Sequence, residues 1–126
     1  MRKSVVWQAD AFEIVVDVRG KRERVPAAMV FDPHEPFILV SRAFPEGTDA
    51  ARCLRVAVQE ALFSYGVMPD RLHVRWGKEK AIEDIASRCG FELTLCDELR
   101  ELAEVKADFG RYAQRALAPR GGLTSE

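Results

Sequence analysis

Residues 48–68, TDAARCLRVAVQEALFSYGVM, carry the pattern that decides the fold of this chain. Thr48 can accept from a free backbone N–H as the amino-terminal cap, and Asp49 suits the positive end of a helix dipole. Gly66 is placed to end the helix in a left-handed conformation, and Pro69 prevents its continuation. Apolar residues at steps of three and four predict one wide buried stripe: Ala51, Leu54, Val58, Ala61, Leu62 and Tyr65, widened by Val56, Ala57 and Phe63.

The residues before this helix predict three strands. Val5 to Val18 is rich in β-branched and aromatic residues, and its even positions from 12 to 18 are apolar, which indicates a long strand with one solvated side. Two short polar turns lead to further strands at Val25–Phe31 and Phe37–Phe44. Strands joined by short turns form an antiparallel meander.

The residues after the helix alternate between strand and helix patterns. We expect a strand at Arg71–Trp76, a helix at Lys78–Cys89, a strand at Phe91–Cys96 and a last helix from Leu99 to Ala116. Gly90 ends the second helix, Asp97 caps the last one, and Gly110 is a point where it can bend. Strand–helix–strand units need right-handed crossovers between parallel strands. The prediction is therefore an α/β domain with a five-stranded mixed sheet covered by helices.

Length and composition agree with one globular domain. The chain has 126 residues, 48% hydrophobic and 31% charged, a size and balance that support a single core. We expect that domain to span residues 1–118, with 119–126 as a disordered tail. Lys plus Arg (19) nearly cancel Asp plus Glu (20). The charge balance therefore provides no global attraction to nucleic acid or to an anionic membrane.

The cysteines and the amino terminus predict a cytoplasmic protein. Cys53 and Cys89 lie among aliphatic residues in helical segments, and Cys96 makes the number odd. This spacing fits buried free thiols in a reducing compartment better than disulfides or a zinc site. Residues 1–10 lack the apolar run of a signal peptide, and no segment approaches the roughly 20 apolar residues of a membrane span.

Several short motifs resemble a known family. The Trp7–Asp10 segment, WQAD, is similar to the W-x-x-D opening of the retroviral-type integrase and transposase core, which has a ribonuclease H-like fold. Further similarities cover the second and third strands, the first long helix and the strand after it: Val30–Asp32, Phe37–Val40, Leu54–Gly66 and Leu72–Gly77. The resemblance extends from about Val5 to Cys96, and the predicted order of elements matches that fold.

The resemblance implies an incomplete catalytic site. In that family, carboxylates from the first strand, the fourth strand and a late helix hold two divalent metal ions for phosphoryl transfer. Asp10 matches the first carboxylate, but Arg75 stands at the second position and cannot ligate a metal. The third would be Glu98, Glu101 or Glu104, which no motif distinguishes. The resemblance therefore implies a relative that lacks the full acidic triad.

Two interpretations of function follow. The leading one is a domain without a metal or other cofactor that acts by binding a protein partner or by assembly. The alternative is a nuclease or strand-transfer enzyme that uses Mg²⁺ or Mn²⁺ with Asp10, Asp32 and a late-helix Glu, either Glu98 or Glu101. A third possibility is a homodimer formed through an exposed sheet edge or the last helix.

Three groups of residues have both a functional and a purely structural interpretation. Asp10 is a metal ligand or, as we favour, an exposed strand end. A basic hairpin could contact nucleic-acid phosphates, although a solvated turn explains it as well: Arg19, Lys21, Arg22 and Arg24, with Arg2 and Lys3 nearby. His34 and His73 could serve acid–base chemistry, but neither belongs to a nucleophile motif.

The Arg75–Lys78 segment follows the predicted fourth strand. Ligands of α/β sheets bind at the carboxyl ends of parallel strands. Arg75, Trp76 and Lys78 are therefore candidates for an anion or aromatic contact, with Trp76 as a core residue being the alternative.

Overall fold

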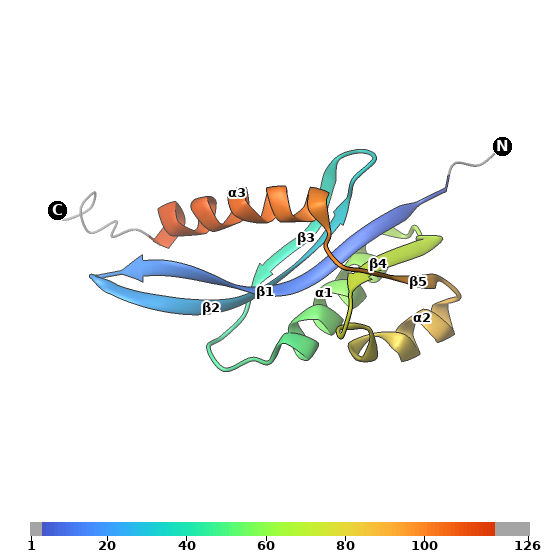
Figure 1. The fold of residues 1–126 in the computed structure, drawn as a ribbon, viewed down its shortest axis with the longest axis horizontal. Coiled ribbons are helices and arrows are strands. Elements are labelled where there is room, and N and C mark those ends of the chain that lie inside the picture. The colour runs from blue at the N-terminus through green and yellow to red at the C-terminus, as the bar shows by residue number, and fades with distance from the viewer. Residues whose placement is uncertain (1–3, 118–126) are drawn as a thin grey trace.

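The computed structural model describes the backbone of residues 4–117 and the side chains of residues 4–108. Its elements follow the order β1 Val6–Val18, β2 Lys21–Asp32, β3 Phe37–Ala43, α1 Ala50–Tyr65, β4 Arg71–Arg75, the 3-10 turn η1 Glu79–Ala81, α2 Glu83–Cys89, β5 Glu92–Cys96 and α3 Arg100–Leu117 (Figure 1). The predicted disordered tail, 119–126, and the basic residues Arg2 and Lys3 lie outside the described residues.

The five strands form one mixed sheet in the order β3-β2-β1-β4-β5. β1 and β2 pair antiparallel along an extended ladder from Gln8 and Phe31 to Val18 and Lys21. β3 adds antiparallel to β2, whereas β4 lies parallel to β1 and β5 parallel to β4. The expected meander with two parallel additions is therefore confirmed.

Helices cover both faces of the sheet: α1 and α2 lie on one side and α3 on the other (Figure 1). Because side chains alternate along a strand, Trp7, Ala9 and Ala11 of β1 join the larger core with α1 and α2. A smaller cluster lies under α3 and contains Met29, Phe31, Leu99 and Leu102, with Phe12, Cys96 and Val105 packed against it. The sheet thus separates two cores of unequal size.

Helix α1 begins one residue later than predicted. Asp49, not Thr48, is its N-cap, because the Asp49 side chain accepts a hydrogen bond from the Arg52 N–H at 2.8 Å. Thr48 instead donates its hydroxyl to the Pro45 carbonyl at 2.7 Å. Gly66 has φ 60 and ends the helix in the left-handed conformation, as expected.

The apolar stripe of α1 is narrower than its sequence suggests. Its buried residues are Cys53, Leu54, Ala57, Val58 and Ala61. Phe63, predicted to widen the stripe, is 91% exposed. It lies well off this stripe around the helix. Ala57 is buried and Val56 packs against the core as predicted, so the prediction was wrong for Phe63 alone of the three widening residues.

The predicted second helix, 78–89, is divided. The short turn η1 and helix α2 meet at Ile82, whose φ of −134 is not helical. Ile82 is fully buried in the larger core. The backbone therefore breaks where this β-branched side chain enters the core. Gly90, with φ 83, ends α2 as predicted, whereas Cys89 beside it is exposed and not buried as expected.

Helix α3 continues from Arg100 to Leu117 through Gly110, so Gly110 does not interrupt it. β3 is an edge strand with an irregular register between Val30 and Phe31 of its neighbour. The Tyr65 hydroxyl of α1 donates to the Leu39 carbonyl at 3.0 Å. The edge is therefore partly covered, which limits pairing with another strand.

Candidate functional site

The candidate site lies where the ladder between β1 and β4 ends. Gln8 and His73 are the last paired residues of this ladder, so the backbone of Ala11 has no partner in β4. The Ala11 N–H donates to Asp10 Oδ1 at 2.9 Å, and the Ala11 carbonyl accepts from Lys78 Nζ at 2.6 Å. Two side chains thus satisfy backbone groups that the strand leaves open.

Asp10 is held between two cations. Its Oδ1 lies 3.0 Å from Lys78 Nζ, and its Oδ2 lies 3.7 Å from Arg75 Nη1. The residue is only 2% exposed, so its interpretation as an exposed strand end was wrong. Lys78, 68 residues further along the chain, makes this burial possible because a buried carboxylate requires a nearby positive charge.

The residues after β4 form the outer part of the site. The Arg75 side chain is 48% exposed and the Lys78 side chain 27%. Trp76 is 63% exposed, so it is not the core residue of the alternative interpretation. β1 and β4 are adjacent and parallel, but β1 leads to β2 on one side and β4 to β5 on the other. Open α/β sheets bind ligands at such a point of reversal.

The charges of this cluster do not cancel. Asp10 contributes one negative charge, whereas Lys78 and Arg75 contribute two positive charges. The Arg75 guanidinium faces the carboxylate at 3.7 Å and makes no hydrogen bond within the described residues. Its donors, together with the exposed indole of Trp76, are available to an anionic or aromatic group. The contact with such a group stays a prediction.

The carboxylates of the alternative interpretation do not gather around Asp10. Asp32 ends β2, and its Oδ1 accepts from the His34 and Glu35 N–H groups of its own turn, at 2.9 and 3.4 Å. Asp10 lies opposite Met29 in the β1–β2 ladder. Among the described residues, no group of three or more His, Cys, Asp and Glu side chains is arranged to hold a metal ion.

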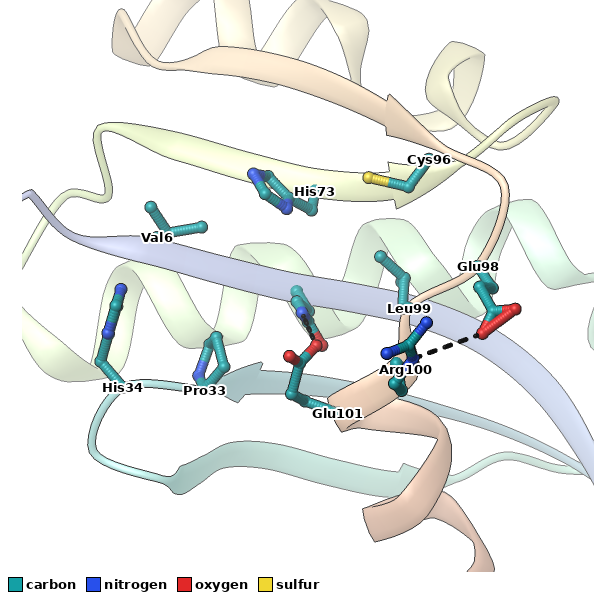
Figure 2. Close-up of a pocket in the computed structure, with 10 residues that line it drawn as sticks. Val6, Pro33, His34, His73, Cys96, Glu98, Leu99, Arg100 and Glu101 are labelled. Carbon is teal, nitrogen blue, oxygen red and sulfur yellow. Dashed lines mark hydrogen bonds and ion pairs between the residues drawn. The ribbon is translucent and has the colours of Figure 1, made fainter.

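Glu98 and Glu101 instead line a separate open cavity of about 590 Å³ (Figure 2). It lies on the α3 face, between the first turn of α3, the β2–β3 turn and strands β1, β4 and β5. Its polar walls contain His34, His73, Cys96, Glu98, Arg100 and Glu101. The structure thus brings both histidines near two of the predicted acidic residues, which the sequence separates widely.

Three groups of this cavity have shifted pKa values. Burial lowers the pKa of His73, and the charge of Arg71 lowers it further. The hydrogen bond from Gln8, 2.8 Å long, lowers the pKa of Glu101. At neutral pH the cavity therefore contains a neutral His73 imidazole and an ionised Glu101 carboxylate. Burial raises the pKa of the Cys96 thiol, which disfavours the reactive thiolate.

Gln8 is a site residue that we did not predict. It is 6% exposed, and it contacts both the Glu101 side chain and the Leu102 backbone. The sequence contains one indication of this role. Gln8 shares its strand parity with the buried Ile14 and Val16, where a polar residue needs a partner.

The basic hairpin residues do not share one face. The turn is formed by Arg19, with φ 53, and Gly20, with φ 82, as in a tight two-residue hairpin. Arg22 and Arg24 lie opposite Asp17 and Val15, whereas Lys21 lies opposite Val18 on the other face. Arg24 also pairs with Glu13 at 3.1 Å. The positive charge is therefore divided and partly balanced, and nucleic-acid contact stays a prediction.

Comparison with known proteins adds no identification. Neither a protein-family model nor a curated protein sequence matches this chain. Within the described residues, no helix is both long and apolar enough to cross a membrane.

Proposed function

We propose that this chain is a ribonuclease H-like domain that acts by binding or assembly and not by metal-dependent phosphoryl transfer. The contact between Lys78 Nζ and Asp10 Oδ1, 3.0 Å long, carries this proposal. In this contact, the Lys78 ammonium group pairs with Asp10, the one carboxylate that matches the integrase and transposase motif.

The sheet supports the fold part of the proposal. Three antiparallel strands are followed by two parallel additions in the order β3-β2-β1-β4-β5. This is the arrangement expected of the ribonuclease H-like fold from the order of its elements. Asp10 on β1 and Arg75 at the end of β4 then occupy neighbouring positions, where that fold carries two carboxylates.

The local chemistry supports the functional part. A divalent ion needs several oxygen ligands, whereas Asp10 Oδ1 already accepts from the Ala11 N–H and from Lys78. Arg75 supplies a second positive charge at 3.7 Å from the other oxygen. Two cations beside a single carboxylate repel a metal ion and leave a positively charged surface. This surface, which includes the exposed Trp76, suits recognition of a partner.

Thermal unfolding with and without Mn²⁺ tests the proposal, in wild type and in Asp10→Asn. A ligand that binds the native state raises its melting temperature. We expect no Mn²⁺-dependent rise in either protein. A rise in wild type that Asp10→Asn loses would overturn the proposal and favour the nuclease interpretation. Glu46→Gln is the matched control, because it removes an exposed carboxylate that the nuclease interpretation does not use.

Assembly is tested separately by light scattering. A homodimer would have twice the 14.2 kDa mass of one chain. If the protein is monomeric, Trp76→Ala and Arg75→Ala should weaken capture of a defined partner once one is found, without lowering the melting temperature. Loss of partner binding only in variants far from this surface would contradict the location of the site.

A further inference from the structure

We propose that the cavity at the first turn of α3 is a binding site for a small organic cation, an amine on an apolar body. This site is distinct from the Asp10 cluster and does not depend on the function proposed above. The cavity measures about 590 Å³, within the range of sites that hold small molecules.

The cavity is built by segments from the whole length of the chain. β1 contributes Val6 and Gln8, the β2–β3 turn contributes Pro33 and His34, and β4 contributes His73. The end of β5 and the first turn of α3 close the other side (Figure 2). Strands β1 and β4, the end of β5, the β2–β3 turn and the start of α3 therefore form the walls together, and the cavity is present without a ligand.

The charge of the walls selects the ligand. Glu98 and Glu101 carry two negative charges, and Arg100 carries one positive charge. Arg100 Nε lies 4.0 Å from Glu98 Oε1, so this pair largely balances itself. Arg71 of β4 pairs with Glu92 at 3.4 Å. The Glu101 carboxylate is therefore left as one negative charge, which the positive end of the α3 dipole at this turn reduces but does not cancel. The cavity still favours a cation over an anion.

The hydrogen-bonding groups agree with this choice. Within the described residues, the His34 and His73 imidazoles have no hydrogen-bond partner or ion pair in the protein. The neutral His73 imidazole offers one donor and one acceptor nitrogen, and Glu101 retains acceptor capacity beyond its bond from Gln8. An ammonium group has three donors and no acceptor. It can therefore donate both to the Glu101 carboxylate and to the acceptor nitrogen of His73.

The remaining walls accommodate an apolar body. Val6, Pro33 and Leu99 line the same cavity as the charged residues. Figure 2 shows Val6 and Pro33 on the side of the histidines and Leu99 at the start of α3. An amine with an attached hydrocarbon group would bury apolar surface here in addition to its charge contacts.

The chain provides its own reporters for a binding test, because its only two histidines, His34 and His73, both line the cavity. We would follow their ring signals by NMR at pH 7.5 with three probes that share one body: 2-phenylethylamine, 2-phenylethanol and 3-phenylpropionate. The amine should shift both histidine signals saturably, with an affinity about tenfold higher than that of either analogue. Equal effects of the three probes, or no effect of the amine, would overturn the proposal.

Three variants locate the charge. Glu101→Gln and Glu98→Gln should each weaken amine binding several-fold, and Glu98→Gln leaves the bond between Gln8 and Glu101 intact. Glu104→Gln is the control, because it removes the same charge from an exposed position of α3 outside the cavity. Binding that survives both Glu98→Gln and Glu101→Gln would overturn the assignment. A fourth probe, Nα-acetyl-lysine methylamide, distinguishes between the two possible sources of the amine. Tighter binding than that of 2-phenylethylamine indicates that the ligand is a basic side chain of a partner protein. Weaker binding indicates a free small-molecule amine.

Discussion

The side-chain oxygen Oε1 of Gln8 accepts a hydrogen bond from the backbone N–H of Leu102 at 3.0 Å. Leu102 lies in the first turn of α3, whose N–H groups have no partner within the helix. The same Gln8 amide donates to Glu101 Oε1 at 2.8 Å. One buried residue of β1 therefore caps a helix 94 positions later in the chain and fixes it to the sheet.

Replacing Gln8 by Leu should lower the free energy of unfolding by about 2 kcal/mol, because a buried N–H of α3 loses its acceptor. Urea denaturation measures the change. Gln59→Leu, at an exposed position of α1, is the control and should change stability by about 0.5 kcal/mol or less. Equal effects of the two substitutions would show that Gln8 does not hold α3.

The ion pair of Asp10 and Lys78 should respond asymmetrically to substitution. Lys78→Met leaves a carboxylate that is 2% exposed without its closest cation and should cost about 3 kcal/mol of unfolding free energy. Asp10→Asn should cost less, because the partly exposed Lys78 can turn toward water. Chemical denaturation of both single variants and the double variant gives the coupling. The exposed pair Glu13 and Arg24 is the control, and additive effects at Asp10 and Lys78 would contradict the prediction.

The capping of α1 can be tested by paired substitutions. Asp49→Ala should destabilise the protein by about 1 kcal/mol, because the Arg52 N–H loses its acceptor. Thr48→Ala removes only the hydroxyl that donates to Pro45 and should cost less. Thermal unfolding compares the two variants. A larger loss for Thr48→Ala would support the cap predicted from sequence.

Asp84 should make stability depend on acid pH. Hydrogen bonds from Arg55, at 2.7 and 2.9 Å, lower the pKa of Asp84 to about 2. A lowered pKa stabilises the folded state above the ordinary value near 3.8, and this contribution is lost as the pH falls toward 2. The melting temperatures of wild type and Asp84→Asn should therefore converge between pH 5 and about pH 2.5, although solvent exposure limits the effect. Glu83→Gln, next to Asp84 on α2, is the control, and its melting temperature should not converge with that of wild type over this pH range. If it does converge, the effect comes from the charge of the helix and not from the pair of Asp84 and Arg55.

His73 should make the protein less stable at acid pH, whereas a salt-bridged histidine makes a protein more stable there. Burial and the charge of Arg71 lower its pKa below 6.5, and Glu101 opposes this shift. The unfolded chain therefore takes up the proton first, so stability falls as the pH drops through about 6.5. Ring NMR should place the His73 pKa below 6.5. His73→Gln should reduce the fall in melting temperature between pH 7.5 and 5.5. His34→Gln is the control and should keep the part of this fall that His73 causes. If the melting temperature of His73→Gln depends on pH as that of wild type does, the prediction is wrong.

The sequence alone determines much of the architecture. Alternating and helical patterns identify every strand and the two long helices to within a few residues. Short turns impose the antiparallel meander, and the crossover rule imposes the parallel additions of β4 and β5. Left-handed Gly66 and Gly90 follow from their positions after apolar helices. These features depend on residues within one short segment, so local physical chemistry is sufficient to predict them.

The tertiary structure decided the candidate sites. The burial of Asp10 depends on Lys78 returning to β1, and Gln8 finds its partners in α3. The cavity exists because His34, His73 and Glu101, from three separate segments, line the same space. Ion pairs, buried polar contacts and cavity walls join distant segments, and their geometry depends on register and packing. No short stretch of the sequence contains that information, so it appears only when the chain is folded.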